Sequence, residues 1–207
     1  MKPDYLQATD VIDWDHPQVR SMAQQLGDQA GGESMAIART CFEWVRDQVR
    51  HCCDHKLNPV TCRASDVLEH KTGYCFAKSH LLAALLRAND IPTGFCYQRL
   101  TFSTEKPPHI LHGFNGAYLP EVGWYRMDAR GNRKGINAQF TPPIEQLAFT
   151  STLPGETNFA AILPNPLPIV IQALNPRKTW NTVLYELPDI CPAEAEKHGL
   201  NQPPSSL

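Results

Sequence analysis

The segment 73–92 constrains the fold of this chain more than any other part of its sequence. Over residues 76–89, apolar side chains recur at the helical period and cover most of the helix surface, namely Ala77, Leu81, Leu82, Ala84, Leu85, Leu86 and Ala88. Ile91 and Pro92 end the helix, because proline cannot continue it. A helix this apolar must be buried, so the rest of the chain has to pack around it.

The flanking segments predict the elements that surround this central helix. We predict helices within residues 1–32, closed by Gly27 and then by Gly31-Gly32, over residues 33–49, and over residues 64–70 with Ser65 as the cap. Strands are predicted over residues 94–102, 110–119 and 123–129, the last two joined as a hairpin by Pro120, Glu121 and Val122. Further on we predict short helices over residues 169–174 and 179–187, then a frayed tail over residues 192–207.

Length and composition limit the kind of protein that this chain can form. Its 207 residues suit a single domain spanning residues 1–207, and no linker or repeat divides it. A net charge of -2 provides no field that would draw nucleic acid or an anionic membrane. Residues 1–10 lack the apolar region of a secretory signal, and no apolar stretch approaches the roughly 18 residues of a membrane span, so we expect a cytoplasmic protein.

The seven cysteines indicate reduced thiols rather than a disulfide framework, since their number is odd and no secretory signal precedes them. One of them, Cys75, stands at the predicted start of the central helix, directly after Gly73 and Tyr74. The unpaired N–H groups at a helix N-terminus lower the pKa of a thiol and can donate hydrogen bonds to an oxyanion. The alternative is that Cys75 is only a small apolar residue, because cysteine is among the most buried residue types.

A histidine and an aspartate in the predicted hairpin favour a reactive thiol. His112 and Asp128 each interrupt an apolar strand, where they are costly to bury unless they pair or perform chemistry. With Cys75 they supply a nucleophile, a base and a carboxylate that fixes the tautomer of the base. If Leu119 pairs with Trp124, the numbers of any two paired residues add up to an odd number. The numbers of His112 and Asp128 add up to an even one, so their side chains then face opposite sides of the sheet. A shared site therefore requires an even register.

Three segments of the chain resemble the core of the transglutaminase-like superfamily, and they read ASDVLEH, GYCFAKSHLLAALLRANDIPTGF and HILHGFNGAYLPEVGWYRMDARGN. The similarity covers residues 34–140, and the N-terminal stretch YLQATDVIDWDHP resembles bacterial transglutaminase-like cysteine proteases. The resemblance implies a papain-like α+β fold, in which a central helix carrying the cysteine packs on an antiparallel sheet carrying the histidine and the aspartate. Residues 141–207 would then form a C-terminal extension packed on this core.

The resemblance also implies roles for individual residues. Cys75 would be the nucleophile, His112 the general base and then the general acid, and Asp128 the residue that orients the imidazole. Members of the family add an oxyanion donor upstream of the cysteine. The candidates here for this donor or for a substrate contact are Gln48, His51 and Tyr74. We expect acyl transfer from a peptide, protein or small amide through a Cys75 thioester, with water as acceptor, as in a cysteine peptidase or amidase.

Other interpretations stay open at this point. With an amine as acceptor, the same site would make the chain a protein-glutamine transglutaminase, and a non-catalytic member of the fold would bind a peptide or a partner protein. A structural zinc would need ligands from the cluster of His51, Cys52, Cys53, His55 and Cys62, whose spacing suits zinc poorly. No acidic loop has the spacing of calcium ligands, so we expect neither a metal nor a cofactor. The natural substrate and the oligomeric state do not follow from the sequence.

Overall fold

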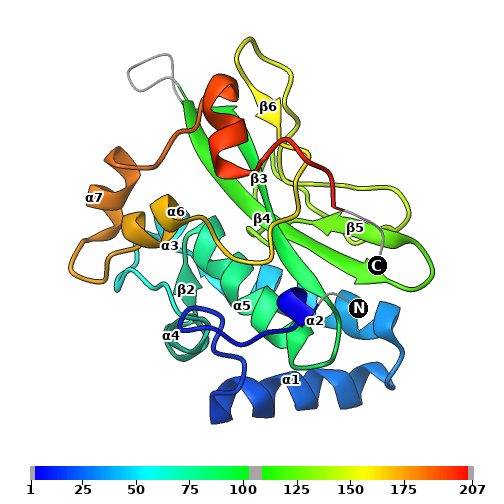
Figure 1. Ribbon diagram of the computed structural model, residues 1–207. Helices are drawn as coiled ribbons and strands as arrows, with labels where there is room; N and C mark the ends of the chain where they lie inside the picture. The colour runs from blue at the N-terminus through cyan, green and yellow to red at the C-terminus, as the bar shows by residue number, and fades with distance from the viewer. Residues whose placement is uncertain (1–2, 103–108, 205–207) are drawn as a thin grey trace.

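The computed structural model describes residues 3–102 and 109–204, with a buried helix at its centre. This helix, α5 (Cys75–Arg87), has every residue buried, as its apolar pattern predicts. In Figure 1, α5 lies between the helices at the bottom of the view and the twisted sheet above them. Neither α5 nor any other described helix is long and apolar enough to cross a membrane.

Three helices pack against α5, namely α1 (Pro17–Ala30), α2 (Ser34–Gln48) and α4 (Ala64–His70). Gly27, predicted to close the first helix, lies inside α1 instead. It is needed there for a close contact, since a Cβ on Gly27 would lie 2.5 Å from Oδ1 of Asn89. The helix ends at Gly31, which has a positive φ of 78° that glycine adopts without strain.

The predicted cap of α4 is wrong. The helix follows Arg63, and neither the side chain of Arg63 nor that of Ser65 caps it. The buried carboxylate of Asp13 takes this role, because its Oδ1 accepts a hydrogen bond from the N–H of Ser65 (3.1 Å) and its Oδ2 accepts one from Arg63 (3.1 Å). A carboxylate also suits the positive end of the helix dipole. The cap therefore comes from a residue far away in the sequence.

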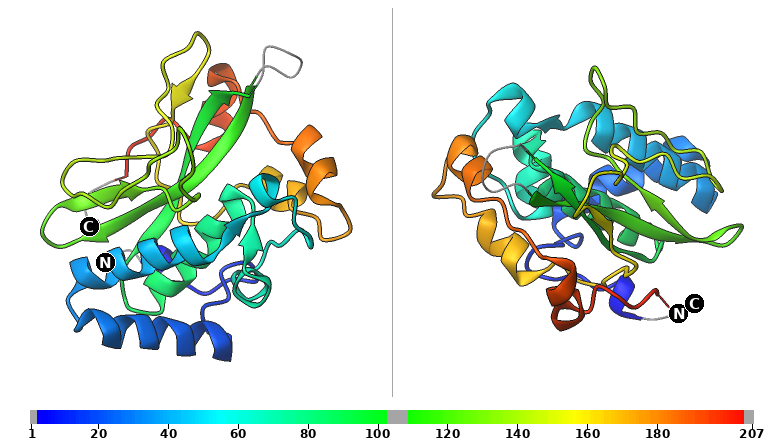
Figure 2. Two further views of the ribbon diagram at one scale, coloured as in Figure 1. Left: turned by 180° about the vertical axis from the view of Figure 1, so that it is seen from behind. Right: turned by 90° about the horizontal axis from the view of Figure 1, so that it is seen from above.

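An antiparallel sheet packs on α5 and has the strand order β5-β4-β3-β6 within the described residues. Its strands are β3 (Thr93–Thr101), β4 (His109–Leu119), β5 (Gly123–Met127) and β6 (Thr157–Asn158). Gly113 lets β4 approach the helix closely, since a Cβ there would lie 2.5 Å from Cδ1 of Phe76. In the left view of Figure 2, α1, α2 and the sheet follow one another from bottom to top. The structure confirms the α+β fold with the cysteine helix on an antiparallel sheet.

The hairpin between β4 and β5 has the even register that a shared site requires. Leu119 pairs with Gly123, so the pairing with Trp124 is wrong by one residue. Gly123 closes the short loop with a positive φ of 76°, a conformation open to glycine and strained for most other residues. Continued by one residue beyond β5, this register places Asp128 on the same face of the sheet as His112.

A short parallel pair of strands leads directly into two helices. The strands are β1 (Arg50–His51) and β2 (Thr72–Gly73), and His51 pairs with Gly73. Helix α3 (Cys52–His55) follows β1, and α5 follows β2. The pairing therefore brings the starts of α3 and α5 side by side, and with them the side chains that flank Cys75.

The chain after residue 140 folds back over the core. Helices α6 (Pro168–Ala173) and α7 (Trp180–Tyr185) lie close to their predicted ranges. The predicted fraying of the tail is wrong for its first part, because the 3₁₀-helix η2 (Pro192–His198) forms there and both Ala195 and Leu200 are buried. Apolar side chains in a mostly polar stretch hold it against the core. Residues 205–207 of the predicted tail lie outside the described residues.

The buried guanidinium of Arg87 joins three distant segments at the end of α5. Its N–H groups donate hydrogen bonds to the carbonyl oxygens of Gln7 (2.8 Å), Thr93 (3.0 and 2.7 Å) and Pro164. These carbonyls belong to the segment after the 3₁₀-helix η1 (Pro3–Tyr5), to the start of β3 and to the segment before α6. Segments near both ends of the chain are thus tied to the central helix.

Candidate active site

Cys75 is the first residue of α5 and lines a cavity at the N-terminus of this helix. Tyr74 before it is extended, and the N–H of Lys78 donates the first hydrogen bond of the helix to the Tyr74 carbonyl (2.9 Å). The N–H groups of Cys75, Phe76 and Ala77 therefore precede the intrahelical hydrogen bonds. The structure places the thiol at the positive end of a buried helix, as the sequence indicates.

His112 and Asp128 form a buried pair next to this thiol. Nε2 of His112 lies 2.7 Å from Oδ2 of Asp128, which leaves Nδ1 as the ring nitrogen available to Cys75, whose interaction with the imidazole raises the pKa of His112. Asp128 follows the last residue of β5 rather than lying within a strand as predicted. There its carboxylate also accepts hydrogen bonds from the N–H groups of Arg130 (3.0 Å) and Ala148 (3.1 Å). These contacts fix the carboxylate, and the carboxylate fixes the imidazole.

Each member of the pair shifts the pKa of the other so that its charged form is favoured. Burial lowers the pKa of His112, but the negative charges of Asp128 and Cys75 and the hydrogen bonds to both outweigh it and raise this pKa to about 10. Burial raises the pKa of Asp128, whereas His112 and the two N–H donors lower it more, so the net pKa lies below the usual value. An imidazole whose pKa is raised in this way is protonated near neutral pH, and an imidazolium beside a sulfur is the arrangement that can stabilise a thiolate.

Cys75 and His112 line a cavity of about 330 Å³, and Asp128 is buried behind the imidazole. Its polar lining near the thiol includes His51, Cys53, Tyr74 and Arg130. Its apolar lining consists of Leu100, Phe102, Ile110, Leu111, Phe149, Leu184 and Leu187. The sequence did not indicate these apolar residues as part of a site, because they come from β3, from β4 and from the chain after residue 140.

The three candidate oxyanion donors occupy different places. Gln48 is exposed at the end of α2 and lines another hollow, so it does not belong to this cavity. Tyr74 lines the cavity, but its hydroxyl donates a hydrogen bond to the carbonyl of Trp180. His51 lines the cavity too, and its buried Nδ1 has no hydrogen-bond partner among the described residues, although Oδ1 of Asp54 lies 3.9 Å away. Of the three side chains, His51 is the one that lines the cavity without a hydrogen bond to another described residue.

The electrostatic surroundings keep His51 neutral. Burial lowers its pKa well below the usual value, and the positive charges of Arg130 and Lys78 lower it further. Its ring lies edge-on to that of Tyr74, with 5.7 Å between the ring centroids. A neutral imidazole carries one N–H and one acceptor nitrogen, so it can donate a single directed hydrogen bond into the cavity.

Arg130 forms a charged part of the cavity wall that the sequence did not indicate. Its guanidinium makes a bidentate ion pair with Asp54 (2.7 and 3.0 Å) and lies over the ring of Phe149, 5.6 Å from the centroid. The only local signal was its position two residues after Asp128. The pair ties α3, which carries Asp54, to the segment that holds Asp128.

The other thiols differ from Cys75 in their surroundings, although all seven are free. Burial raises the pKa of Cys41 to about 12 and that of Cys62 to about 11. Burial also raises the pKa values of Cys52, Cys53 and Cys96. These five thiols are therefore poorly ionised near neutral pH and make weak nucleophiles.

The cysteine and histidine cluster of residues 51–62 does not come together as a metal site. Within residues 3–102 and 109–204, no group of three or more histidine, cysteine, aspartate or glutamate side chains is placed to hold a metal ion. His51 and Cys53 face the cavity of Cys75, whereas Cys52 is buried in the core. Adjacent cysteines at the start of a short helix point in different directions, which explains the dispersal.

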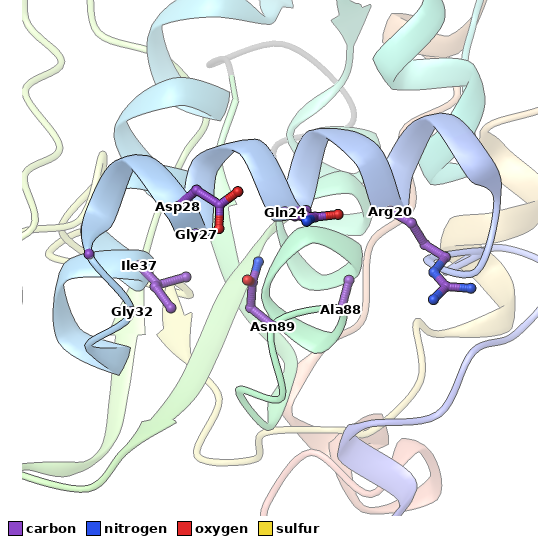
Figure 3. A pocket seen from close by; sticks show the side chains of 9 residues that line it. Arg20, Gln24, Gly27, Asp28, Gly32, Ile37, Ala88 and Asn89 are labelled. Atoms are coloured by element: carbon purple, nitrogen blue, oxygen red, sulfur yellow. The ribbon is translucent and has the colours of Figure 1, made fainter.

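A second, wider hollow of about 580 Å³ lies between α1 and the end of α5. Figure 3 shows Arg20, Gln24 and Asp28 of α1 on one side of it and Asn89 on the other. Its lining holds no cysteine or histidine, and the amide of Asn89 is engaged by the carbonyls of Ala23 and Leu85. Among the described lining residues, Cys75 and His112 therefore meet at the smaller cavity and not at this hollow.

A helix that begins with a cysteine, packed on an antiparallel sheet whose histidine pairs with an aspartate, defines a papain-like fold. The family model of the transglutaminase-like superfamily matches residues 20–129, more than half of the chain. The chain belongs to this superfamily, and the resemblance noted in its sequence is confirmed. The matched range contains Cys75, His112 and Asp128.

Solved structures give more distant matches. One is a protein from Cytophaga hutchinsonii named "Putative Cysteine Protease", at 20% identity and a TM-score of 0.45, covering 61% of this chain and 40% of that one. Another is the periplasmic domain of TgpA from Pseudomonas aeruginosa, at 20% identity and a TM-score of 0.45, covering 60% of this chain and 45% of that one. The chain thus spans less than half the length of either structure. No curated protein matches it.

Proposed function

We propose that this chain is a thiol enzyme that transfers acyl groups from peptide or amide substrates through a Cys75 thioester, with water as the acceptor. The proposal rests above all on the buried 2.7 Å contact between His112 and Asp128 beside the thiol at the head of α5. A structural cysteine would need neither an oriented imidazole nor a buried carboxylate, and both are costly to bury. Membership of the transglutaminase-like superfamily supports the same assignment.

In the proposed reaction, the Cys75 thiolate attacks the carbonyl carbon and forms a C–S bond. The protonated His112 then gives its proton to the nitrogen of the leaving amine as the C–N bond breaks. In the second half, His112 takes a proton from water, the hydroxide oxygen attacks the thioester carbon, and the carboxylic acid leaves as the thiolate re-forms. Asp128 keeps the imidazole oriented through both halves.

The oxyanion of each tetrahedral intermediate needs donors at the head of α5. The N–H of Cys75 is one of the groups that precede the intrahelical hydrogen bonds. We propose His51 as the second donor, because it lines the same cavity, stays neutral and has a free buried nitrogen. Replacing an oxyanion donor typically slows turnover by about 10²–10³-fold. His51→Ala should therefore lower kcat while leaving the reactivity of the Cys75 thiol in place.

The first test is alkylation with iodoacetamide from about pH 5 to about pH 9, followed by peptide mapping. We expect Cys75 to react far faster than Cys41 or Cys96 near neutral pH, since the buried thiols have raised pKa values. In His112→Ala this advantage should disappear. If Cys75 reacts no faster than the buried thiols, the site is not an enzyme site, and a peptide-binding member of the fold becomes the better description.

Release of the amine from short peptide amides then separates the possible acceptors. Hydrolysis predicts a free carboxylic acid in water and little change when a primary amine is added. A transglutaminase would instead give the amine adduct as the main product. Cys75→Ser serves as the control, because it keeps the size of the side chain and removes the thiolate. Turnover that persists in Cys75→Ser would contradict the proposal.

A further inference from the structure

The segment that runs from Trp180 to Asp189 forms one wall of the cavity that holds Cys75. Leu184 and Leu187 both line this cavity. The segment lies outside residues 20–129, which match the family model, so this wall belongs to the present chain rather than to the shared core. In Figure 1 the segment starts at α7 beside α3 and then passes upward toward the beginning of β4.

Both ends of the segment are bound to the sequence neighbours of the catalytic residues. At one end, the carbonyl of Trp180 accepts a hydrogen bond from the hydroxyl of Tyr74, the residue before Cys75. At the other end, the carbonyl of Pro188 accepts one from the N–H of Leu111 (2.7 Å), the residue before His112. The two leucines between these anchors are therefore held at fixed positions relative to the thiol and the imidazole.

Further contacts make this wall rigid. The carboxylate of Asp189 pairs with Arg99 of β3 through two hydrogen bonds of 2.7 Å, and the N–H of Trp180 donates to Oδ1 of Asn58 (2.9 Å). Within α7, Val183 is fully buried in the core and Tyr185 is 78% exposed. Leu184 lies between them in sequence and points to neither the core nor the solvent but to the cavity.

Across the described lining of the cavity, apolar side chains from β3 and β4 accompany these leucines, among them Leu100 and Ile110. The one carboxylate of the lining, Glu156, is already engaged by the N–H groups of Thr101 (2.8 Å) and of two residues in its own loop. When an apolar ligand group covers apolar surface that is exposed to water in a cavity, the free energy of binding becomes more favourable. A cavity of about 330 Å³ is also at the small end for a ligand site.

We infer that Leu184 and Leu187 form an apolar subsite, which selects short acyl donors that carry a large apolar side chain next to the carbonyl attacked by Cys75. This inference rests on the proposed acyl transfer and adds to it the class of substrate. The subsite excludes donors whose corresponding side chain is positively charged, because Glu156 is already engaged and the lining carries the guanidinium groups of Arg130 and Arg133.

The test uses a pair of thiol reagents that differ only in their apolar part, N-methylmaleimide and N-benzylmaleimide. For Cys75 we measure the ratio of the two alkylation rates and divide it by the same ratio for glutathione in solution. We expect this normalised ratio to be about tenfold or more in the wild type, the usual effect of filling an apolar pocket. In Leu184→Ala and in Leu187→Ala it should fall severalfold. In Tyr185→Ala, the matched control on the solvent side of α7, it should stay at the wild-type value.

A normalised ratio near one in the wild type, or an equal fall in Tyr185→Ala, would overturn the subsite. Thermal unfolding of each variant shows that it is folded, and the two leucine variants give independent readings if one of them is not. Failure of the proposed function is seen in a different experiment, namely when the rate of Cys75 alkylation by iodoacetamide does not depend on His112. The normalised maleimide ratio is independent of that result, because the intrinsic reactivity of the thiol cancels in it. Rates of amine release from leucine, phenylalanine, alanine and lysine amides should then follow the same apolar preference.

Discussion

Cys75, His112 and Asp128 are coupled electrostatically, so a change at one of them should move the proton equilibrium of another. In Cys75→Ser the sulfur is lost, and Asp128 remains as the group that raises the pKa of the imidazole. We therefore expect the pKa of His112 to fall below its wild-type value of about 10. An NMR titration of the imidazole measures this pKa, with His112→Ala used to assign the signal. An unchanged pKa would show that the sulfur does not interact with the imidazole.

Lys78 is a buried cation one turn along α5 from the thiol. Its ammonium donates hydrogen bonds to the carbonyls of Arg46 (3.2 Å) and Val49 at the end of α2. Burial lowers its pKa to about 7, compared with about 10.4 in an unfolded chain. Between these values the unfolded chain binds one proton more than the folded protein, so stability rises with pH.

The free energy of unfolding of the wild type should thus increase relative to that of Lys78→Met from about pH 7 to about pH 10. Urea titrations of both proteins at several pH values give this difference. A difference that stays constant over the range would mean that the ammonium keeps its ordinary pKa in the folded state. A decrease would contradict the sign of the shift.

The sequence was sufficient to predict which thiol stands at the start of the central helix but not what surrounds it. Cys75 could be singled out because a helix start is a local signal, and His112 and Asp128 because polar residues stand out in apolar strands. Gln48 and His51 were equivalent candidates by sequence position alone. Only the pairing of β1 with β2 places His51 at the cavity and leaves Gln48 on the surface. Leu184 carries no local signal, because long-range packing alone brings it to the site.

At the scale of elements, ranges were easier to predict than ends and registers. The periodicity of α5 and the alternation of β4 are each repeated over many residues, so a few exceptions do not obscure them. The register of the hairpin depends on Gly123, the first residue of β5, whose positive φ ends the loop one position earlier than predicted. The alternation of apolar residues is compatible with a pairing of Leu119 with either Gly123 or Trp124, so it could not determine the register. The common face of His112 and Asp128 follows from that single residue.

The cap of α4 provides a test at this scale. Asp13→Ala removes the acceptor for the N–H of Ser65 and the partner of Arg63. Loss of a helix cap typically costs about 1 kcal/mol, so we expect the free energy of unfolding to fall by about that amount. Asp15→Ala is a matched control, since Asp15 is exposed and two residues away. Equal effects of the two substitutions in chemical denaturation would show that Asp13 does not cap the helix.

At the scale of the whole molecule, segments near both ends of the chain contribute contacts that the central core needs. The N-terminal segment supplies the cap of α4 and an acceptor for Arg87, and the segment after residue 140 supplies one wall of the cavity and the N–H of Ala148 that holds Asp128. A core of the superfamily without these segments would leave the carboxylate with fewer donors and the cavity open on one side. Folding of the outer segments and assembly of the site are therefore coupled.

Arg87 is the residue at which this coupling can be measured. In Arg87→Met, the carbonyls of Gln7, Thr93 and Pro164 would lose their donor in a buried place, at about 1–3 kcal/mol for each unsatisfied group. We expect the free energy of unfolding to fall by about 3 kcal/mol or more, and amide protons near all three carbonyls to lose protection from exchange together. Arg20→Met, at an exposed position of α1, should change stability by less than about 0.5 kcal/mol. If Arg87→Met loses protection only at β3, the outer segments fold independently of the central helix, and the site would assemble without them.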